Sequence, residues 1–283
     1  MKRTCFFHAG CPDGFGAAWA VRRAWGNSAD YLARGHEDAF RPSEWGGSVV
    51  VFVDISLENR ALRALGEIAA HVLVLDHHVS ARDHFESDRG LENALKAHGH
   101  LVRFDLERSG ATLAWHHFHP DVPTPSLLAY VEDQDLWRWK LPGSEEVNAA
   151  ISSYPRRFDV WDELAETPAE ELARQGAPIV QANRCEVERL LRTSHPVALG
   201  SRRVEAVNSA LLRSTVGHEL AKRATFGEPW GLVYRLHGRR ADVSLYSIGG
   251  LDVSRIAKEY GGGGHRNAAG FSVSLEKWLA DFV

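Results

Sequence analysis

The chain has 283 residues, of which 44% are hydrophobic and 25% charged, as in a soluble globular protein with a sizeable core and about two domains. The formal net charge of −4 excludes a protein whose whole surface binds nucleic acid, although it allows a local basic groove. Three cysteines exclude a disulfide framework, and no apolar run is long enough for a signal peptide or a membrane span. We therefore expect a cytoplasmic protein with no membrane partner.

Three short apolar runs near the N-terminus predict strands that are buried on both faces, at Thr4–Phe7, Val49–Val53 and His71–Leu75. The segments Phe15–Val21 and Leu57–Ala70, which separate these runs, have helical patterns. Strands that alternate with helices indicate βαβ units and therefore a parallel sheet.

Side chains of the metal-ligating kind follow each of the three predicted strands. They are His8 and Asp13 after the first, Asp54 after the second, and Asp76, His77 and His78 after the third. Aspartate is a common turn and cap residue, but capping alone does not explain three such strand ends in succession. Because ligands of open α/β sheets bind outside the carboxyl ends of the strands, we predict a shared metal site there.

A further acidic pair, Asp133 and Asp135, follows the segment Ser126–Val131, which reads as a helix or a strand. Trp137 and Trp139 come directly after this pair, in an arrangement that could stack bases at a cleft. Since aromatic residues more often belong to a core, we make no prediction for these two tryptophans.

The middle of the chain predicts a helical connection between two domains. Leu141–Phe158 reads as a loop, and Thr167–Glu170 has the cap, first-turn proline and capping-box glutamate of a helix start. Gly176 and Pro178 then predict an interruption, after which Ile179–Leu191 resumes the helix.

The last part of the chain repeats the alternation of strands and helices at a smaller scale. Strands are predicted at Arg203–Val207, Gly231–Leu236, Asp242–Tyr246 and Phe271–Val273, and helices at Val216–Ala224 and Val253–Tyr260. Between the last helix and the last strand lies the glycine-rich run Gly261–Gly270. Glycine amides next to the guanidinium of Arg266 predict a cradle for phosphate oxygens.

These motifs, in this order, resemble the DHH phosphoesterase family. Asp76-His77-His78 resembles the motif that names the family, with the upstream His8, Asp13-Gly14 and Asp54, the downstream Asp133, and a glycine-histidine run like that of the DHH-associated C-terminal domain. The resemblance covers essentially the whole chain and extends to RecJ-like and nanoRNase-like enzymes. It implies an α/β protein with an N-terminal parallel-sheet DHH domain (1–158), a helical linker (159–195) and a smaller α/β C-terminal substrate-binding domain (196–283).

The resemblance also implies roles for individual residues. His8 and Asp54 would bind one metal ion, and Asp13, Asp54, His77 and Asp133 the other, with Asp54 shared. Asp76 and His78 would be catalytic, by orienting ligands or the attacking water and stabilising the leaving oxygen. The substrate would be held by Gly262, Gly263, Gly264, His265 and Arg266. Asp135 could replace Asp133 as a ligand, because spacing alone does not choose between them.

Two positions depart from the family pattern. The first motif usually carries two acids, Asp-x-Asp-Gly, and here the first of them falls on Cys11. A thiolate is a soft ligand that favours Zn²⁺, so the first metal could be weakly bound, absent or not manganese. In addition, Tyr246 stands where the family often has a substrate-binding arginine.

The function that follows is a metal-dependent phosphoesterase, a hydrolase of the nuclease kind. We expect a phosphodiesterase of the exonuclease or oligoribonuclease type that uses metal-activated water to release mononucleotides from short single-stranded nucleic acid or nucleotides. Oxygen and imidazole ligands suit Mn²⁺, with Mg²⁺ as the alternative, and one or two ions. The rival hypotheses are a small-molecule phosphomonoesterase or pyrophosphatase and a catalytically weak nucleotide-binding sensor. Substrate length, sugar, cleavage polarity and oligomeric state, including a homodimer, stay open.

Overall fold

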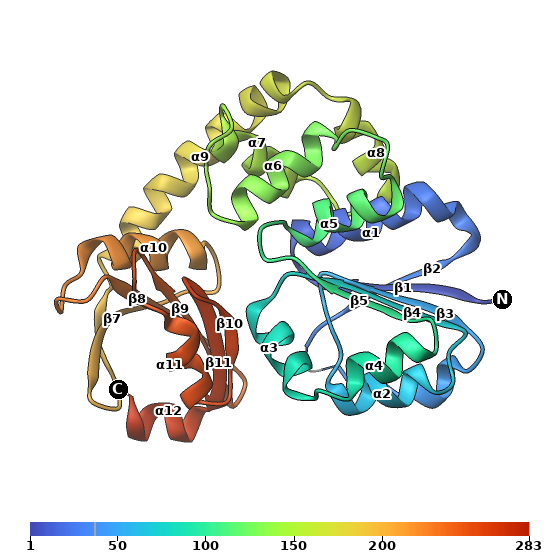
Figure 1. Ribbon diagram of the computed structural model, residues 1–283. Helices are drawn as coiled ribbons and strands as arrows, with labels where there is room; N and C mark the ends of the chain where they lie inside the picture. The colour runs from blue at the N-terminus through green and yellow to red at the C-terminus, as the bar shows by residue number, and fades with distance from the viewer. Residues whose placement is uncertain (37, 283) are drawn as a thin grey trace. The chain divides into compact units, whose positions relative to one another are not determined.

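Figure 1 shows the computed structural model of the protein, which describes residues 1–36 and 38–282. The chain forms two compact units, Met1–Val180 and a second unit that begins at Gln181, and each is described here by itself. The boundary between the two units falls inside the predicted linker, 159–195. Both units are mixed α/β structures, so the predicted fold class is confirmed.

The first unit is built on a five-stranded parallel sheet with the strand order β2-β1-β3-β4-β5. Its strands are β1 (Arg3–His8), β2 (Asp30–Arg34), β3 (Val49–Val53), β4 (His71–Asp76) and β5 (Leu101–Phe104). The chain leaves β1 toward one edge to form β2 and then returns to the other side of β1 to form β3. The order of the strands therefore reverses between β1 and β3, and such a switch point is where open α/β sheets bind ligands.

Alternate residues of the central strands enter two separate cores, as expected for a sheet covered on both faces (Figure 1). One core receives Phe7 and Val53 and is covered by α1 (Pro12–Trp25) and α5 (Gly110–Phe118). The other core receives Phe6 and Phe52. This second core is covered by α2 (Asn59–Gly66), α3 (Val79–Ser87) and α4 (Leu91–Ala97). The first unit also contains two short 3₁₀ helices, η1 (Gly26–Ser28) and η2 (Pro42–Trp45).

Four further helices follow in the chain: α6 (Ser126–Asp135), α7 (Ser144–Ser153), α8 (Phe158–Glu166) and α9 (Ala169–Leu191). Two expectations were wrong here. The predicted loop at 141–158 contains α7, whose apolar Val147 and Ile151 are buried. In addition, Gly176 and Pro178 do not interrupt α9, which is a continuous helix. A Cβ at Gly176 would lie 1.7 Å from the carbonyl oxygen of Glu146. That glycine serves close packing of α9 on α7, and Pro178 is accommodated within the helix.

The second unit has a six-stranded sheet with the order β10-β11-β9-β8-β7-β6. Its elements are β6 (His195–Leu199), β7 (Arg202–Asn208), α10 (Arg213–Arg223), β8 (Trp230–His237), β9 (Arg240–Ser247), α11 (Val253–Glu259), β10 (Gly263–His265), β11 (Ala268–Ser274) and α12 (Leu275–Asp281). Among the described strand pairs of this second sheet, only β7 and β8 are parallel, and α10 connects these two strands. One face packs against α10 through Val216 and Leu220, and the other packs against α11 and α12 through Ile256 and Trp278.

Several elements have too weak a sequence pattern to be predicted. The strands β2 and β5 are edge strands of the first sheet, and exposed residues interrupt their apolar pattern. The predicted helix Leu57–Ala70 is shorter in the structure, because α2 ends at Gly66. In the described parts of the chain, no helix is both long and apolar enough to span a membrane.

Candidate metal centre

The carboxyl ends of three neighbouring strands bring the candidate ligands together. Phe7 of β1 pairs with Val53 of β3, and Val53 pairs with Leu75 of β4. The residues that come next in each strand or just after it, His8, Asp54 and Asp76, therefore follow one another along the sheet edge. This edge includes the switch point between β1 and β3, so the predicted convergence of these strand ends is what the structure shows.

Three carboxylates surround the imidazole of His77. Its Nε2 lies 3.0 Å from Asp54 Oδ1, 3.6 Å from Asp13 Oδ2 and 3.6 Å from Asp135 Oδ2. The other oxygen of Asp54, Oδ2, lies 3.4 Å from His8 Nδ1. Asp54 thus presents one oxygen to each histidine, which is the placement required of a carboxylate shared by two metal positions.

Asp13 is held in place by the start of α5. Its two carboxylate oxygens accept hydrogen bonds from the backbone amides of Gly110 (2.7 Å) and Ala111 (3.0 Å). The next residue, Gly14, has no alternative, because a Cβ there would lie 2.2 Å from the carbonyl oxygen of His8. The first turn of α1 can therefore approach the end of β1 only with glycine after Asp13.

The backbone of Asp54 is in the left-handed region, with φ of 58°. Aspartate tolerates this conformation better than most residues, but it is uncommon away from turns and functional sites. The amide of Asp54 donates to the carbonyl oxygen of Leu75 at 2.9 Å, which ties this turn to β4. The strained residue is thus the one between the two histidines.

Asp76 organises the turn that contains the two histidines. Its Oδ1 accepts from the backbone amides of His77 (2.7 Å) and His78 (3.2 Å) and lies 2.7 Å from His78 Nδ1. The Asp76 side chain is fully buried, so these contacts fix the orientation of the His78 ring. Asp76 therefore positions His78, and one of its carboxylate oxygens also lies within 4.8 Å of ligand atoms of Asp54 and His78.

The charges at the cluster are those of a site that accommodates a cation. Burial and the carboxylates of Asp54 and Asp135 raise the pKa of Asp13 well above its usual value. Desolvation and the carboxylate of Asp54 also raise the pKa of Asp135, although His77 opposes the shift. Burial alone would raise the pKa of Asp54, but hydrogen bonds from His77 and His8 hold it well below its usual value. A divalent cation would stabilise the ionised forms of these carboxylates, and it suits the oxygen and nitrogen donors of the cluster.

The structure does not bring Asp133 into the cluster, contrary to its predicted role as a ligand. Its carboxylate accepts from the backbone amides of Lys140 (3.0 Å) and Leu141 (3.1 Å) and so holds the turn after α6. Asp135, two residues later, faces His77 instead. Two residues along a helix correspond to a rotation of about 200°, so only one of the two acids can face the sheet edge.

The turn held by Asp133 contains Trp137 and Trp139. Both have left-handed backbones, with φ of 55° and 51°, and their ring centroids are 5.1 Å apart in an edge-to-face arrangement. Trp137 is 36% exposed, so this side chain does not belong to the core. Its exposed ring, two residues from Asp135, is a surface on which a base could stack.

His36 lies at the site without having been predicted. Its ring centroid is 4.9 Å from that of His8 and 5.8 Å from that of His78, and the nitrogens of the three rings could share an ion. His36 follows β2, an edge strand without an apolar run. The only signal in the sequence is that this histidine, like His8, comes after a strand.

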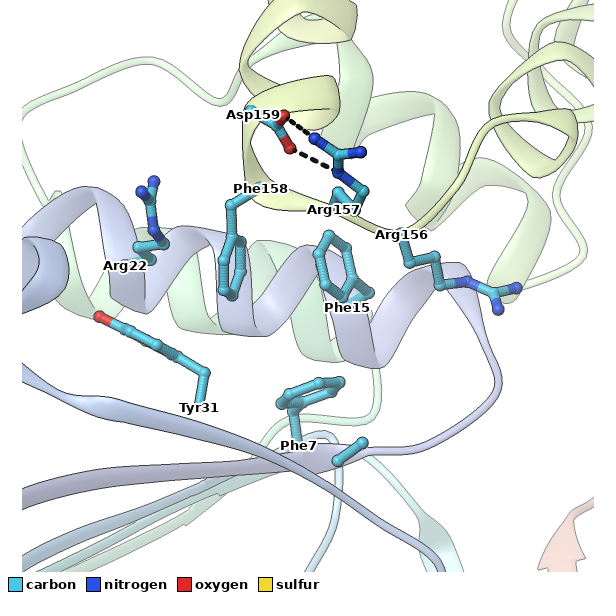
Figure 2. A pocket seen from close by; sticks show the side chains of 9 residues that line it. Phe7, Phe15, Arg22, Tyr31, Arg156, Arg157, Phe158 and Asp159 are labelled. Atoms are coloured by element: carbon cyan, nitrogen blue, oxygen red, sulfur yellow. Dashed lines mark hydrogen bonds and ion pairs between the residues drawn. The ribbon is translucent and has the colours of Figure 1, made fainter.

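A hollow on the α1 side of the sheet contains none of the ligands of the metal centre (Figure 2). It is lined by Phe7, Phe15, Arg22, Tyr31, Ala33, Arg156, Arg157, Phe158 and Asp159. Phe15 and Phe158 stack with centroids 4.9 Å apart, and Arg157 is paired with Asp159. Arg156 points away from the rings in Figure 2. The hollow therefore marks where α8 begins against α1, and it does not extend the ligand set.

Comparisons with known proteins agree with the motifs and the fold. Residues 204–283 match the DHHA1 domain family. This last part of the chain is therefore a DHHA1 domain.

The chain is also similar to a curated protein and to several solved structures. It is 28% identical over 299 residues to the uncharacterized protein R106 of Acanthamoeba polyphaga mimivirus, covering 98% of this chain and 68% of that protein. RecJ of Thermus thermophilus, solved in complex with Mn²⁺, has a TM-score of 0.52 and 18% identity, covering 99% of this chain and 50% of RecJ. An exopolyphosphatase-related protein of Bacteroides fragilis has a TM-score of 0.50 and 12% identity, covering 95% and 86% of the two chains. These two likenesses concern the fold, and this chain spans half the length of RecJ.

In the DHHA1 domain, the glycine run forms a turn and a hairpin rather than an open cradle. The amides of Gly261 and Gly262 donate to the carbonyl oxygens of Lys258 (3.1 Å) and Ala257 (2.9 Å), which closes the end of α11. A Cβ at Gly262 would lie 2.0 Å from the carbonyl oxygen of Gly270. The prediction that Gly262 binds substrate through its amide therefore disagrees with the structure, which uses this glycine for close packing.

Two guanidinium groups of the DHHA1 domain differ in what they contact. Arg266 donates to the carbonyl oxygen of Gly250 at 2.7 Å, a contact within its own loop. Arg213, at the start of α10, donates to the hydroxyl of Ser244 at 3.2 Å on β9. Ser244 lies on the same strand as Tyr246, two residues away. A guanidinium therefore reaches the strand on which the family often carries its arginine, although it comes from a different element.

Proposed function

We propose that this protein is a metal-dependent phosphodiesterase of the DHH family that hydrolyses short oligonucleotides or nucleotides and releases mononucleotides. The observation that carries the proposal is the convergence of His8, Asp54 and His77 from three strand ends with Asp13 and Asp135 from two helices. Such a set of acids and imidazoles at a switch point is more than packing or capping requires.

The residues divide into two candidate metal positions. His8 and Asp54 belong to one, and Asp13, His77 and Asp135 belong to the other, with Asp54 between them. Divalent cations bound there would polarise the phosphoryl oxygens and make water a stronger nucleophile at neutral pH. The mostly oxygen and imidazole donors favour Mn²⁺, with Mg²⁺ as the alternative, and the RecJ structure of similar fold is a Mn²⁺ complex.

Asp76 and His78 would act on the substrate rather than on the metal. The contact between Asp76 Oδ1 and His78 Nδ1 keeps the imidazole in one orientation, so that the ring does not have to be ordered during the reaction. We propose that His78 donates a hydrogen bond to a phosphoryl or leaving oxygen. Asp76 is then a positioning residue.

The DHHA1 domain would supply substrate contacts through Gly263, Gly264 and His265, with Arg266 or Arg213 available for a phosphate. A domain of this family supports a nucleotidyl substrate over pyrophosphate. The chemistry common to these substrates is a phosphate ester next to a sugar and base.

The test is hydrolysis of a labelled dinucleotide, a long labelled single strand and pyrophosphate, each with Mn²⁺, Mg²⁺ or EDTA. We expect Mn²⁺-dependent release of mononucleotides that is lost in His78→Ala and kept in His98→Ala, a matched histidine exposed at the end of α4. Phosphate release from pyrophosphate alone would replace the proposal by a pyrophosphatase. Nucleotide binding without any hydrolysis would replace it by a sensor.

A further inference from the structure

Cys11 places a thiol against one of the two metal positions. Its Sγ lies 3.5 Å from His8 Nδ1 and 3.5 Å from Asp54 Oδ2. These sulfur, nitrogen and oxygen atoms all lie within 4.8 Å of one another, close enough for one ion to contact all three. Asp54 is buried and Cys11 is half-buried, so the three ligands are held by the fold rather than by a mobile surface.

The role of Cys11 as a helix cap does not account for this residue type. Cys11 is the N-cap of α1, and its Sγ accepts from the amide of Gly14 at 3.2 Å. Serine, aspartate and asparagine are the strongly preferred N-caps, and each would accept the same hydrogen bond better than a thiol. What only cysteine adds at this position is a soft ligand that faces an imidazole and a carboxylate.

The neighbouring metal position has no sulfur. Its side chains are Asp13, His77 and Asp135, which offer oxygen and nitrogen only. The two positions therefore share Asp54 but differ in chemical character. Thiolate ligands select Zn²⁺ and similar ions, whereas carboxylates suit Mn²⁺ and Mg²⁺.

We propose that His8, Cys11 and Asp54 form a site selective for a thiophilic divalent ion such as Zn²⁺, while the Asp13, His77 and Asp135 position takes Mn²⁺ or Mg²⁺. The protein would then carry two different metals side by side. Binding at the first position forms a bond from the metal to Cys11 Sγ, and the thiol proton leaves to solvent. This inference rests on the same metal centre as the proposed function.

Cobalt provides a direct probe, because Co²⁺ substitutes for Zn²⁺ and gives a near-ultraviolet charge-transfer band when a thiolate binds it. The chelator-treated full chain is titrated with Co²⁺ under a non-thiol reductant. We expect the band in the wild type and in Cys185→Ser, whose thiol is exposed on α9, and its loss in Cys11→Asp and Cys11→Ser. Zn²⁺ should remove the band and Mn²⁺ should not, and Cys11→Asp should lower the preference for Zn²⁺ over Mn²⁺.

The outcomes separate this inference from the proposed function. A band that persists in Cys11→Asp, or that Mn²⁺ removes as readily as Zn²⁺, would overturn the thiophilic site even if the enzyme hydrolyses dinucleotides. A Cys11-dependent band in a protein that hydrolyses no substrate, with any combination of the two metals, would support the thiophilic site and refute the phosphodiesterase. Circular dichroism of each variant before the titration shows that a lost band does not come from unfolding.

Discussion

Replacing Gly110 by alanine adds a single methyl group where α5 begins against Asp54. A Cβ at this position would lie 2.4 Å from Asp54 Cβ and 2.8 Å from both Cγ and Oδ1. Neither side can yield easily, because Asp54 already has a left-handed backbone and the amide of Gly110 is bound to Asp13. Overpacking of this kind costs about 1–3 kcal/mol.

That loss should be visible as a fall in Tm of roughly 2–12 °C, since each kcal/mol lowers Tm by about 2–4 °C at this chain length. The effect on catalysis should be larger. Moving α5 by about 1 Å displaces both Asp13 and Asp54, and a misplacement of that size can cost about 100-fold in rate. Thermal unfolding and Mn²⁺-dependent dinucleotide hydrolysis measure the two effects separately.

Gly46→Ala is the matched control, because a Cβ there would meet no atom within 4 Å and its φ of −55° suits alanine. We expect its Tm and activity to stay close to those of the wild type. A Gly110→Ala protein with unchanged Tm and unchanged activity would refute the reasoning, because the approach of α5 to Asp54 would then be looser than the structure indicates.

Three further predictions concern single side chains. Asp135→Asn should lower the amount of bound Mn²⁺, measured by mass spectrometry, while Tm stays nearly unchanged. Asp133→Asn should lower Tm, because it weakens the turn after α6, and should affect the bound metal less. The reverse pattern would make Asp133 the ligand. Asp76→Asn should lower kcat by about 10- to 100-fold with the metal content retained, because it weakens the hold on His78, and loss of metal would contradict a positioning role. Trp137→Ala should raise the KM for a dinucleotide about 5- to 150-fold, corresponding to about 1–3 kcal/mol of stacking. The KM for an abasic analogue should not change in this variant. An equal rise in KM for the dinucleotide and the abasic analogue would exclude stacking.

The sequence was most informative where the apolar pattern was continuous. The runs ending at His8, Asp54 and Asp76 are buried central strands. Their continuous apolar residues identify the strands, and the end of each run marks the sheet edge at which polar residues emerge. The edge strands β2 and β5 were missed because several of their residues are exposed, so their sequences have no continuous apolar run. His36 was missed with β2, since nothing local distinguishes it from an exposed histidine.

Local rules also misled where a small residue served a distant neighbour. Gly176 reads as a helix breaker, but it allows α9 to approach the backbone of Glu146. Gly262 reads as a free amide for phosphate, but its amide closes α11 and its missing Cβ makes room for β11. In both cases the reason for glycine is the close approach of another segment, which the residue type alone does not reveal.

The amino-acid sequence by itself determined the α/β class, the resemblance to the DHH family and the strand ends on which His8, Asp54 and His77 lie, because residue type and hydrophobic pattern are properties of short segments. Only the tertiary structure decided between Asp133 and Asp135, put His36 beside His8, and set the thiol of Cys11 against His8 and Asp54. Those outcomes depend on how helices rotate and approach the sheet edge, and that is fixed by packing between segments far apart in the chain.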